Sequence, residues 1–175
     1  LGGTSGRTTL NGEGLQHEDG HSHILANTIP NCVTYDPTFA HEVAVIMHHG
    51  MKRMVEQQEN VFYYITLLNE NYPMPGLTAG TEEQIIKGMY MCKPGAVPPQ
   101  GTSGASEKRV QLLGSGTILR ESIAAQTLLA ADWGIQADVW SCPSFNELTR
   151  EGQDAERWNL LHPLETPRVP FVAQQ

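Results

Sequence analysis

Short apolar, β-prone runs alternate along the chain with stretches of helical periodicity. The runs at 31–35 and 61–68 predict strands, and the second is nearly all apolar or aromatic, as in a strand covered on both faces. Between them, apolar residues recur every three or four positions up to about residue 57, which predicts a helix. Its predicted core face consists of Ala40, Val43, Ala44, Met47, Met51, Met54 and Val55. Strand, helix and strand in this order predict a right-handed crossover in a parallel sheet.

The predicted helix has a start signal and carries three histidines, His41, His48 and His49. Asp36 is a favoured N-cap residue, and Pro37 suits the first helical position. His48 and His49 are neighbours, so on a helix they point about 100° apart and cannot join one site. We therefore expect these histidines at the surface or at an interface.

The second half of the chain predicts another α/β unit. A strand at 109–113, a turn at 114–117, a helix at 118–133 that ends at Gly134 and a strand at 137–142 follow one another. The residues expected to face inward from this helix are Ile118, Ile123, Ala125, Leu128 and Leu129. Gly114-Ser115-Gly116 could be a phosphate loop, but it lacks a third glycine and a P-loop lysine, which favours a plain turn.

The remaining segments complete an α/β fold with parallel sheets. Short helices are expected at 22–27 and from residue 81, and a partly helical stretch at 145–158 precedes an extended, proline-rich stretch at 162–170. The run 93–107 is rich in Pro, Gly and Ser, so we predict a linker there, between an α/β unit at 1–92 and a second unit at 108–175.

Composition excludes several classes of protein. The 175 residues are 39% hydrophobic and 17% charged, which fits a folded domain. The net charge is 11 − 19 = −8 without a basic run, so nucleic-acid binding is not expected. No apolar segment approaches the roughly 20 residues that span a membrane. Three widely spaced cysteines, Cys32, Cys92 and Cys142, suit buried thiols in a reducing cytoplasm.

The stretch at 12–23 concentrates groups that move protons or bind metals. It contains three histidines and three acidic residues between glycines: Glu13, His17, Glu18, Asp19, His21 and His23. His17-Glu18-Asp19-Gly20-His21 fits the zinc-hydrolase pattern H-E-x-x-H. That pattern needs a stable helix, and Asp19 and Gly20 are poor helix formers. Another interpretation of this stretch is a solvated polar loop in which the histidines have no chemical role.

Long strings of residues in a fixed order give a more specific signal. Residues 3–23 resemble the homodimeric pyruvate dehydrogenase E1 family, thiamine-diphosphate enzymes of the transketolase-like superfamily. The resemblance covers nearly the whole chain except 93–107. It continues in Asn69-Glu70-Asn71-Tyr72, Leu112-Leu113-Gly114-Ser115-Gly116, Gly152-Gln153-Asp154, Glu156-Arg157-Trp158-Asn159 and the run from Leu161 to Pro170.

The resemblance implies a fold, a reaction and site residues. The chain would span the end of the pyrimidine-binding middle domain and the start of the C-terminal domain. By position, His17 matches the family's active-site histidine and Glu13 an acidic residue of the same loop, with His21 and His23 as weaker candidates. The implied cofactors are thiamine diphosphate and Mg²⁺. No Gly-Asp-Gly motif followed by Asn is present, so most of the cofactor site is expected outside this chain, and no metal ligand is assigned.

The family's activity requires partners. The resemblance implies a second E1 subunit, and the lipoyl and subunit-binding domains of the E2 acyltransferase, in the cytoplasm. The chain begins without Met, so we expect a piece of a longer protein that is inactive alone, with an exposed sheet edge in its first unit. The polar residues Asn69 to Tyr72 follow the predicted strand 61–68, so they would either contact a ligand at the carboxyl edge of the sheet or simply form the loop that leaves the strand. The alternative functions are a zinc hydrolase and a non-catalytic assembly module.

Overall fold

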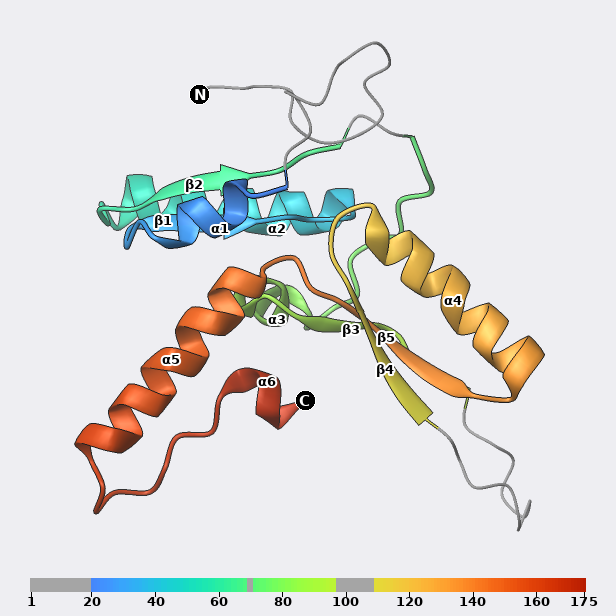
Figure 1. The fold of residues 1–175 in the computed structure, drawn as a ribbon. Helices are drawn as coiled ribbons and strands as arrows, with labels where there is room; N and C mark the ends of the chain where they lie inside the picture. The colour runs from blue at the N-terminus through green and yellow to red at the C-terminus, as the bar shows by residue number, and fades with distance from the viewer. Residues whose placement is uncertain (1–19, 69–70, 97–108) are drawn as a thin grey trace.

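The computed structural model describes residues 20–68, 71–96 and 109–175, and it has an α/β fold with two sheets (Figure 1). In the first sheet, two strands pair in parallel, as the strand–helix–strand pattern predicts. In the second, three strands lie in the order β3-β5-β4, with β4 parallel and β3 antiparallel to β5. The strands are β1 (Cys32–Tyr35), β2 (Phe62–Ile65), β3 (Tyr90–Lys93), β4 (Arg109–Gly114) and β5 (Gln136–Ser141).

Helices flank both sheets. They are α1 (Ser22–Asn27), α2 (Ala40–Met51) with its π-helical continuation η2 (Lys52–Glu56), α3 (Glu82–Lys87), α4 (Ile118–Trp133), α5 (Phe145–Leu161) and α6 (Phe171–Gln174). The helices predicted at 22–27 and 118–133 are confirmed. Gly134 ends α4 in the left-handed region at φ +63°, where glycine is favoured. The sequence analysis did not predict β3 or α6.

The predicted start of α2 is wrong. The helix begins at Ala40, and Phe39, not Asp36, occupies the N-cap position. The Glu42 carboxylate accepts hydrogen bonds from the backbone N–H groups of Thr38 (2.5 Å) and Phe39 (3.0 Å). A side chain in the first turn of the helix thus provides the acceptor for the N–H groups at the helix start. The Asp36 side chain instead accepts hydrogen bonds from Thr66, just after β2, and Ser115, just after β4.

The predicted core face of α2 is also largely wrong. The buried positions are Glu42, Ile46 and Gly50, one stripe at a spacing of four. Gly50 lies under the Tyr63 ring, which would be 3.1 Å from an added Cβ. Met47 and Met51 are about half exposed, and Val55 is more so. The helix therefore faces the core with the side that carries Glu42 and Gly50, because Tyr63 packs closely on Gly50 and the Glu42 carboxylate has its hydrogen-bond donors there. Its more apolar side, with Met47 and Met51, faces outward.

Two further expectations about burial are wrong, the first of them only in part. On α4, Ile123 packs against the core as expected, but Ile118 and Leu128 face outward, and Leu119 and Gln126 are buried. Gln126 turns inward because its amide donates hydrogen bonds to the backbone carbonyls of Lys93 (3.2 Å) and Ala137 (2.8 Å). On β2, Phe62 is 46% exposed, so this strand is not covered on both faces.

The core joins the two sheets. One cluster combines β1, α2, α3 and β3 through Val33, Tyr35, Ile46, Ile85 and Tyr90. The Glu42 carboxylate is fully buried beside this cluster and accepts hydrogen bonds from Tyr90 Oη (2.7 Å) and Ser141 Oγ (2.6 Å). One carboxylate of α2 therefore holds β3 and β5 of the other sheet.

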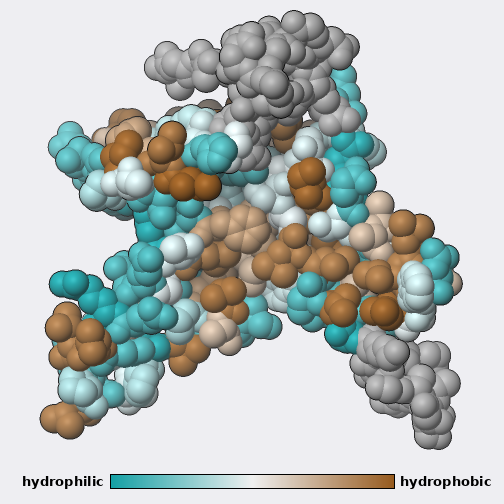
Figure 2. Space-filling view, viewed as in Figure 1, coloured by the Kyte–Doolittle hydropathy of each residue, from teal (hydrophilic) through white to brown (hydrophobic). Residues whose placement is uncertain are grey.

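The viewed face of the molecule has a hollow between α5 and the sheet region of β4 and β5 (Figures 1 and 2). Figure 2 shows hydrophobic side chains gathered there. Leu113 and Phe145 are about half exposed. Among the described residues, no helix is both long and apolar enough to cross a membrane.

Candidate functional site

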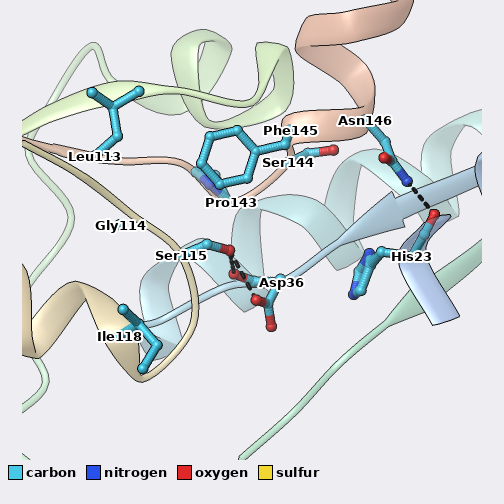
Figure 3. A pocket seen from close by; sticks show the side chains of 10 residues that line it. All are labelled: His23, Asp36, Leu113, Gly114, Ser115, Ile118, Pro143, Ser144, Phe145 and Asn146. Atoms are coloured by element: carbon cyan, nitrogen blue, oxygen red, sulfur yellow. Dashed lines mark hydrogen bonds between the residues drawn. The ribbon is translucent and has the colours of Figure 1, made fainter. Parts of the chain in front are cut away.

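A cavity of about 330 Å³ lies at the carboxyl ends of β1, β4 and β5 (Figure 3). This is the edge at which open α/β sheets bind their ligands. Three helices also reach it, namely α1, α4 and α5. Its lining consists of His23, Asp36, Leu113, Gly114, Ser115, Ile118, Pro143, Ser144, Phe145 and Asn146.

Asp36 is the centre of the polar contacts in this cavity. It follows β1 directly and is only 7% exposed. Its carboxylate accepts hydrogen bonds from the Thr66 hydroxyl, at the end of β2, and from Ser115 Oγ (2.9 Å), at the end of β4. Its backbone N–H donates to the Pro143 carbonyl (2.7 Å), after β5. Asp36 thereby ties together the ends of four strands from both sheets.

The turn after β4 is shaped by its approach to Asp36. Gly116 has φ +53°, and an added Cβ would lie 2.9 Å from an Asp36 carboxylate oxygen. The Gly116 N–H donates to the Asp36 carbonyl (3.0 Å), and Ser115 donates to the carboxylate. The polar groups of this turn are therefore engaged with Asp36, as the interpretation of a plain turn expects.

His23 forms the wall of the cavity on the side of α1. Its Nε2 lies 3.1 Å from Thr66 Oγ1, and its ring packs edge-on against Tyr64. The Asn146 side chain, at the start of α5, donates to the His23 carbonyl (2.8 Å) and to Thr34 Oγ1 (2.6 Å). Figure 3 shows the His23 ring directed toward Asp36.

Ser144 begins α5 beside the cavity. Its hydroxyl accepts a hydrogen bond from the Glu147 N–H (3.1 Å), as an N-cap side chain does, and donates to the Thr34 carbonyl (2.6 Å). The side chain is buried. The start of α5 is thus fixed to β1 and, through Asn146, to α1.

The residues predicted to be catalytic, His17 and Glu13, lie outside the described residues, as do Glu18, Asn69 and Glu70. His21 is described and exposed, and it is the N-cap residue of α1 with φ −131° and ψ −5°. The helix therefore begins after His21, whereas the zinc pattern needs both of its histidines within a helix. In the described part of the chain, no group of three or more His, Cys, Asp or Glu residues could hold a metal ion.

Of the other candidate residues, Tyr72 and His162 pack against neighbouring side chains, whereas Asn71 and His48 are exposed. Tyr72 packs against Phe39 and donates a hydrogen bond to the Thr38 carbonyl, and Asn71 is exposed. His48 is exposed on α2, as expected. His162 stacks on Trp158 with ring centroids 4.4 Å apart.

The cysteines are free, as expected, and do not form a reactive site. Burial, together with the charge of Glu42, raises the pKa of Cys92 to about 11 and that of Cys142 to about 12. Both are therefore thiols at neutral pH, the unreactive form of cysteine. Burial also raises the pKa of Cys32.

A second cavity, of about 370 Å³, lies between α5 and the starts of β1 and β2. Its lining mixes arginines and carboxylates, and one of these arginines, Arg150, is already engaged. Arg150 donates to the carbonyls of Cys32 (2.7 Å) and Ile29 (3.0 Å) and pairs with Glu147. We interpret this cavity as part of the packing of α5 against β1.

Three residues in or beside this cavity were not predicted from the sequence as site residues, namely Asp36, Thr66 and Asn146. The signal was present in part, because Asp36 directly follows the predicted strand 31–35 and Asn146 comes soon after the predicted strand 137–142, whereas Thr66 lay inside the predicted strand 61–68, which in the structure ends at Ile65. In parallel pairing, the carboxyl ends of neighbouring strands meet at one edge. Asp36 also matches the pattern of a helix N-cap followed by proline, which is why it was not predicted to lie at this edge.

Comparison with known protein families shows two matches that together account for most of the chain. Residues 1–75 match the family model described as "Pyruvate dehydrogenase E1 component middle domain". Residues 88–174 match the model described as "Transketolase-like TK C-terminal domain".

Curated relatives match along the whole chain. The pyruvate dehydrogenase E1 component of Escherichia coli K12 is 62% identical over 175 residues, and that of Cupriavidus necator is 59% identical over 174. Each match covers 99% of this chain and 19% of the relative, so the chain spans about one fifth of the length of these relatives.

Solved structures support the fold. Transketolase from Pichia stipitis superposes with a TM-score of 0.54 at 16% sequence identity, over 79% of this chain and 18% of the transketolase chain. At this identity the likeness shows a shared fold and nothing about activity.

Proposed function

Because the chain belongs to the pyruvate dehydrogenase E1 family, we propose that it is the part of an E1 enzyme that joins the middle domain to the transketolase-type C-terminal domain. The proposed activity of the whole enzyme is decarboxylation of pyruvate with thiamine diphosphate and transfer of the acetyl group to a lipoyl group of the E2 acyltransferase. The observation that carries the proposal is identity near 60% over 99% of the chain. That match includes the histidine-rich stretch at 12–23.

His17 and Glu13 are the proposed catalytic residues. An imidazole exchanges protons near neutral pH, which suits the proton transfers of this reaction. Glu13 is proposed to support that transfer from the same stretch. The bound cofactor supplies the electron sink for decarboxylation. In the described residues, no group of three or more His, Cys, Asp or Glu side chains could hold a metal ion, so we assign none of them to the cofactor's metal.

The proposed partners are a second E1 subunit and the lipoyl and subunit-binding domains of E2, and the proposed compartment is the cytoplasm. We keep the division into units at 1–92 and 108–175 as a proposal. β3, at Tyr90–Lys93, pairs with β5, so the first unit would contribute a strand to the sheet of the second. Contacts of this kind favour two units that share one interior over independently folded domains.

Cofactor removal tests the proposed function against the zinc alternative. Full-length protein is stripped by a chelator and assayed for pyruvate-dependent reduction of an artificial electron acceptor. Thiamine diphosphate with Mg²⁺ should restore activity, and Zn²⁺ alone should not, because the electron sink is the cofactor.

A parallel sample with an isolated lipoyl domain should show pyruvate-dependent acetylation of the lipoyl group. Recovery of a hydrolytic activity with Zn²⁺, and no turnover of pyruvate with thiamine diphosphate and Mg²⁺, would contradict the proposal.

A further inference from the structure

The described part of the chain carries an anchor directly downstream of the proposed catalytic residues. The Thr66 hydroxyl has a single hydrogen, and an ionised carboxylate can only accept hydrogen bonds. Thr66 therefore donates to Asp36 and must accept from His23, whose Nε2 lies 3.1 Å away. These donor and acceptor roles require a proton on His23 Nε2, and this N–H group points to Thr66 at the end of β2.

The backbone of His23 is held independently. Its carbonyl accepts a hydrogen bond from the Asn146 side chain (2.8 Å), which also donates to Thr34. The ring is thus fastened to β2 and the backbone to the start of α5. Thr66 and Asp36 are buried, so these hydrogen bonds have little competition from water.

The chain positions of these residues give the anchor a function. His17 is six residues before His23, which limits their separation to about 20 Å even in an extended chain. A shift of about 1 Å in a catalytic group is enough to slow a reaction strongly. Fixing His23 therefore fixes one end of the six-residue stretch that leads back along the sequence to His17.

We propose that Asp36 and Thr66 are positioning residues that act through His23, by fixing the downstream end of the stretch whose sequence includes His17 and Glu13. This inference rests on the proposed function for its catalytic readout. The hydrogen-bond chain Asp36–Thr66–His23 transmits the position of the strand ends to the start of α1, and Asn146 adds a second attachment from α5.

The test uses Thr66→Val in the full-length protein, with Thr66→Ser as the conservative variant and Thr149→Val as the matched control. Valine keeps the shape of threonine but removes the hydroxyl, and serine retains it. Thr149 is exposed on α5 and bonds only to the Phe145 carbonyl of its own helix. Steady-state kinetics with pyruvate are measured at 25 °C, after thermal melting has shown that each variant is folded.

The expected result is a kcat of Thr66→Val lowered roughly 10- to 100-fold with a KM for pyruvate within about twofold of wild type. Thr66→Ser should recover most of the loss, and Thr149→Val should match wild type. Hydrogen exchange of peptides covering α1 should be faster in Thr66→Val alone. If Thr66→Val fails to fold, Asn146→Ala, at a partly exposed position, should give the same kcat loss and faster exchange.

The proposal is overturned if the folded Thr66→Val enzyme keeps the kcat of wild type, or if Thr66→Ser loses as much as Thr66→Val. A wild-type enzyme without pyruvate chemistry would refute the proposed function instead. In that event hydrogen exchange still decides the anchor: faster exchange of α1 in Thr66→Val supports it, and unchanged exchange overturns it.

Discussion

Asp138 is a buried carboxylate on β5 whose surroundings favour its charged form. It accepts hydrogen bonds from Arg109 Nε (2.7 Å), Gln111 Nε2 (2.9 Å) and the Gly95 N–H (2.9 Å). The Arg109 guanidinium, more than the other donors, holds the pKa of this carboxyl far below its usual value. Asp138 thereby fastens β4 and the chain after β3 to the central strand.

Replacing Asp138 should change how stability depends on pH. Asp138→Asn should lower the free energy of unfolding by about 1–3 kcal/mol at neutral pH, because the buried donors lose a charged acceptor. The folded-state pKa lies below the unfolded-state value of about 3.9, so this stabilisation is present above that pH. It is lost as the pH falls through the folded-state pKa.

Thermal melting of the full-length protein between pH 7 and pH 3 measures this difference. The gap between wild type and Asp138→Asn should be constant above about pH 5 and narrow below about pH 4. Asp132→Asn, at an exposed position of α4, is the control and should stay within about 0.5 kcal/mol of wild type. A gap that widens toward low pH would contradict this explanation.

At the scale of elements, α2 is held by a buried carboxylate as well as by its apolar contact with the core through Ile46. Glu42 is fully buried, satisfies the start of its own helix and accepts hydrogen bonds from β3 and β5. Burial and the charge of Glu42 raise the pKa of Tyr90, so Tyr90 remains a donor at any physiological pH. The contact joins the two sheets through one side chain.

Glu42→Gln should therefore destabilise the protein. The glutamine amide is neutral and has one acceptor oxygen in place of two, so the charge-assisted hydrogen bonds from the four donors are weakened or rearranged, which costs about 1–3 kcal/mol. Glu83→Gln is the control, because Glu83 is an exposed partner of Lys87 on α3 and such pairs are worth little. Melting temperatures of the full-length variants measure the difference, and equal melting of both variants would refute the role of Glu42.

Much of the fold was predictable because its elements are locally specified. The helix 118–133 has both a periodic pattern and a terminal glycine, and the order strand–helix–strand gave the parallel pairing of β1 and β2. The start of α2 was not predictable from Asp36, because the side chain is drawn to Thr66 and Ser115 across the fold. β3 was missed because its partner, β5, lies far along the chain.

The candidate site was predictable only in part. A resemblance pointed to the stretch at 12–23, of which His23 lines the cavity. The polar residues that surround it come from separate strand ends, and their proximity appears only after the strands pair. Glu13 and His17 stay predictions.

At the scale of the molecule, the chain is one fifth of its relatives and exposes apolar surface. Met47 and Met51 on α2 and Val55 on η2 are exposed at a spacing of four, and Leu113 and Phe145, which line the cavity in Figure 3, are about half exposed. Apolar groups gathered on a surface are typical of contacts with other protein. They fit the proposal that this chain functions inside a larger E1 enzyme.

The central claim is that this chain supplies the catalytic histidine of an E1 enzyme, and His17→Ala tests it most directly. The measurement is pyruvate-dependent reduction of an artificial acceptor by the full-length protein, with thiamine diphosphate and Mg²⁺ and without zinc. His48→Ala, at an exposed position of α2, is the matched control. We predict that His17→Ala loses about 100-fold or more in kcat while it still binds the cofactor, and that His48→Ala equals wild type. Unchanged turnover in His17→Ala would contradict the account.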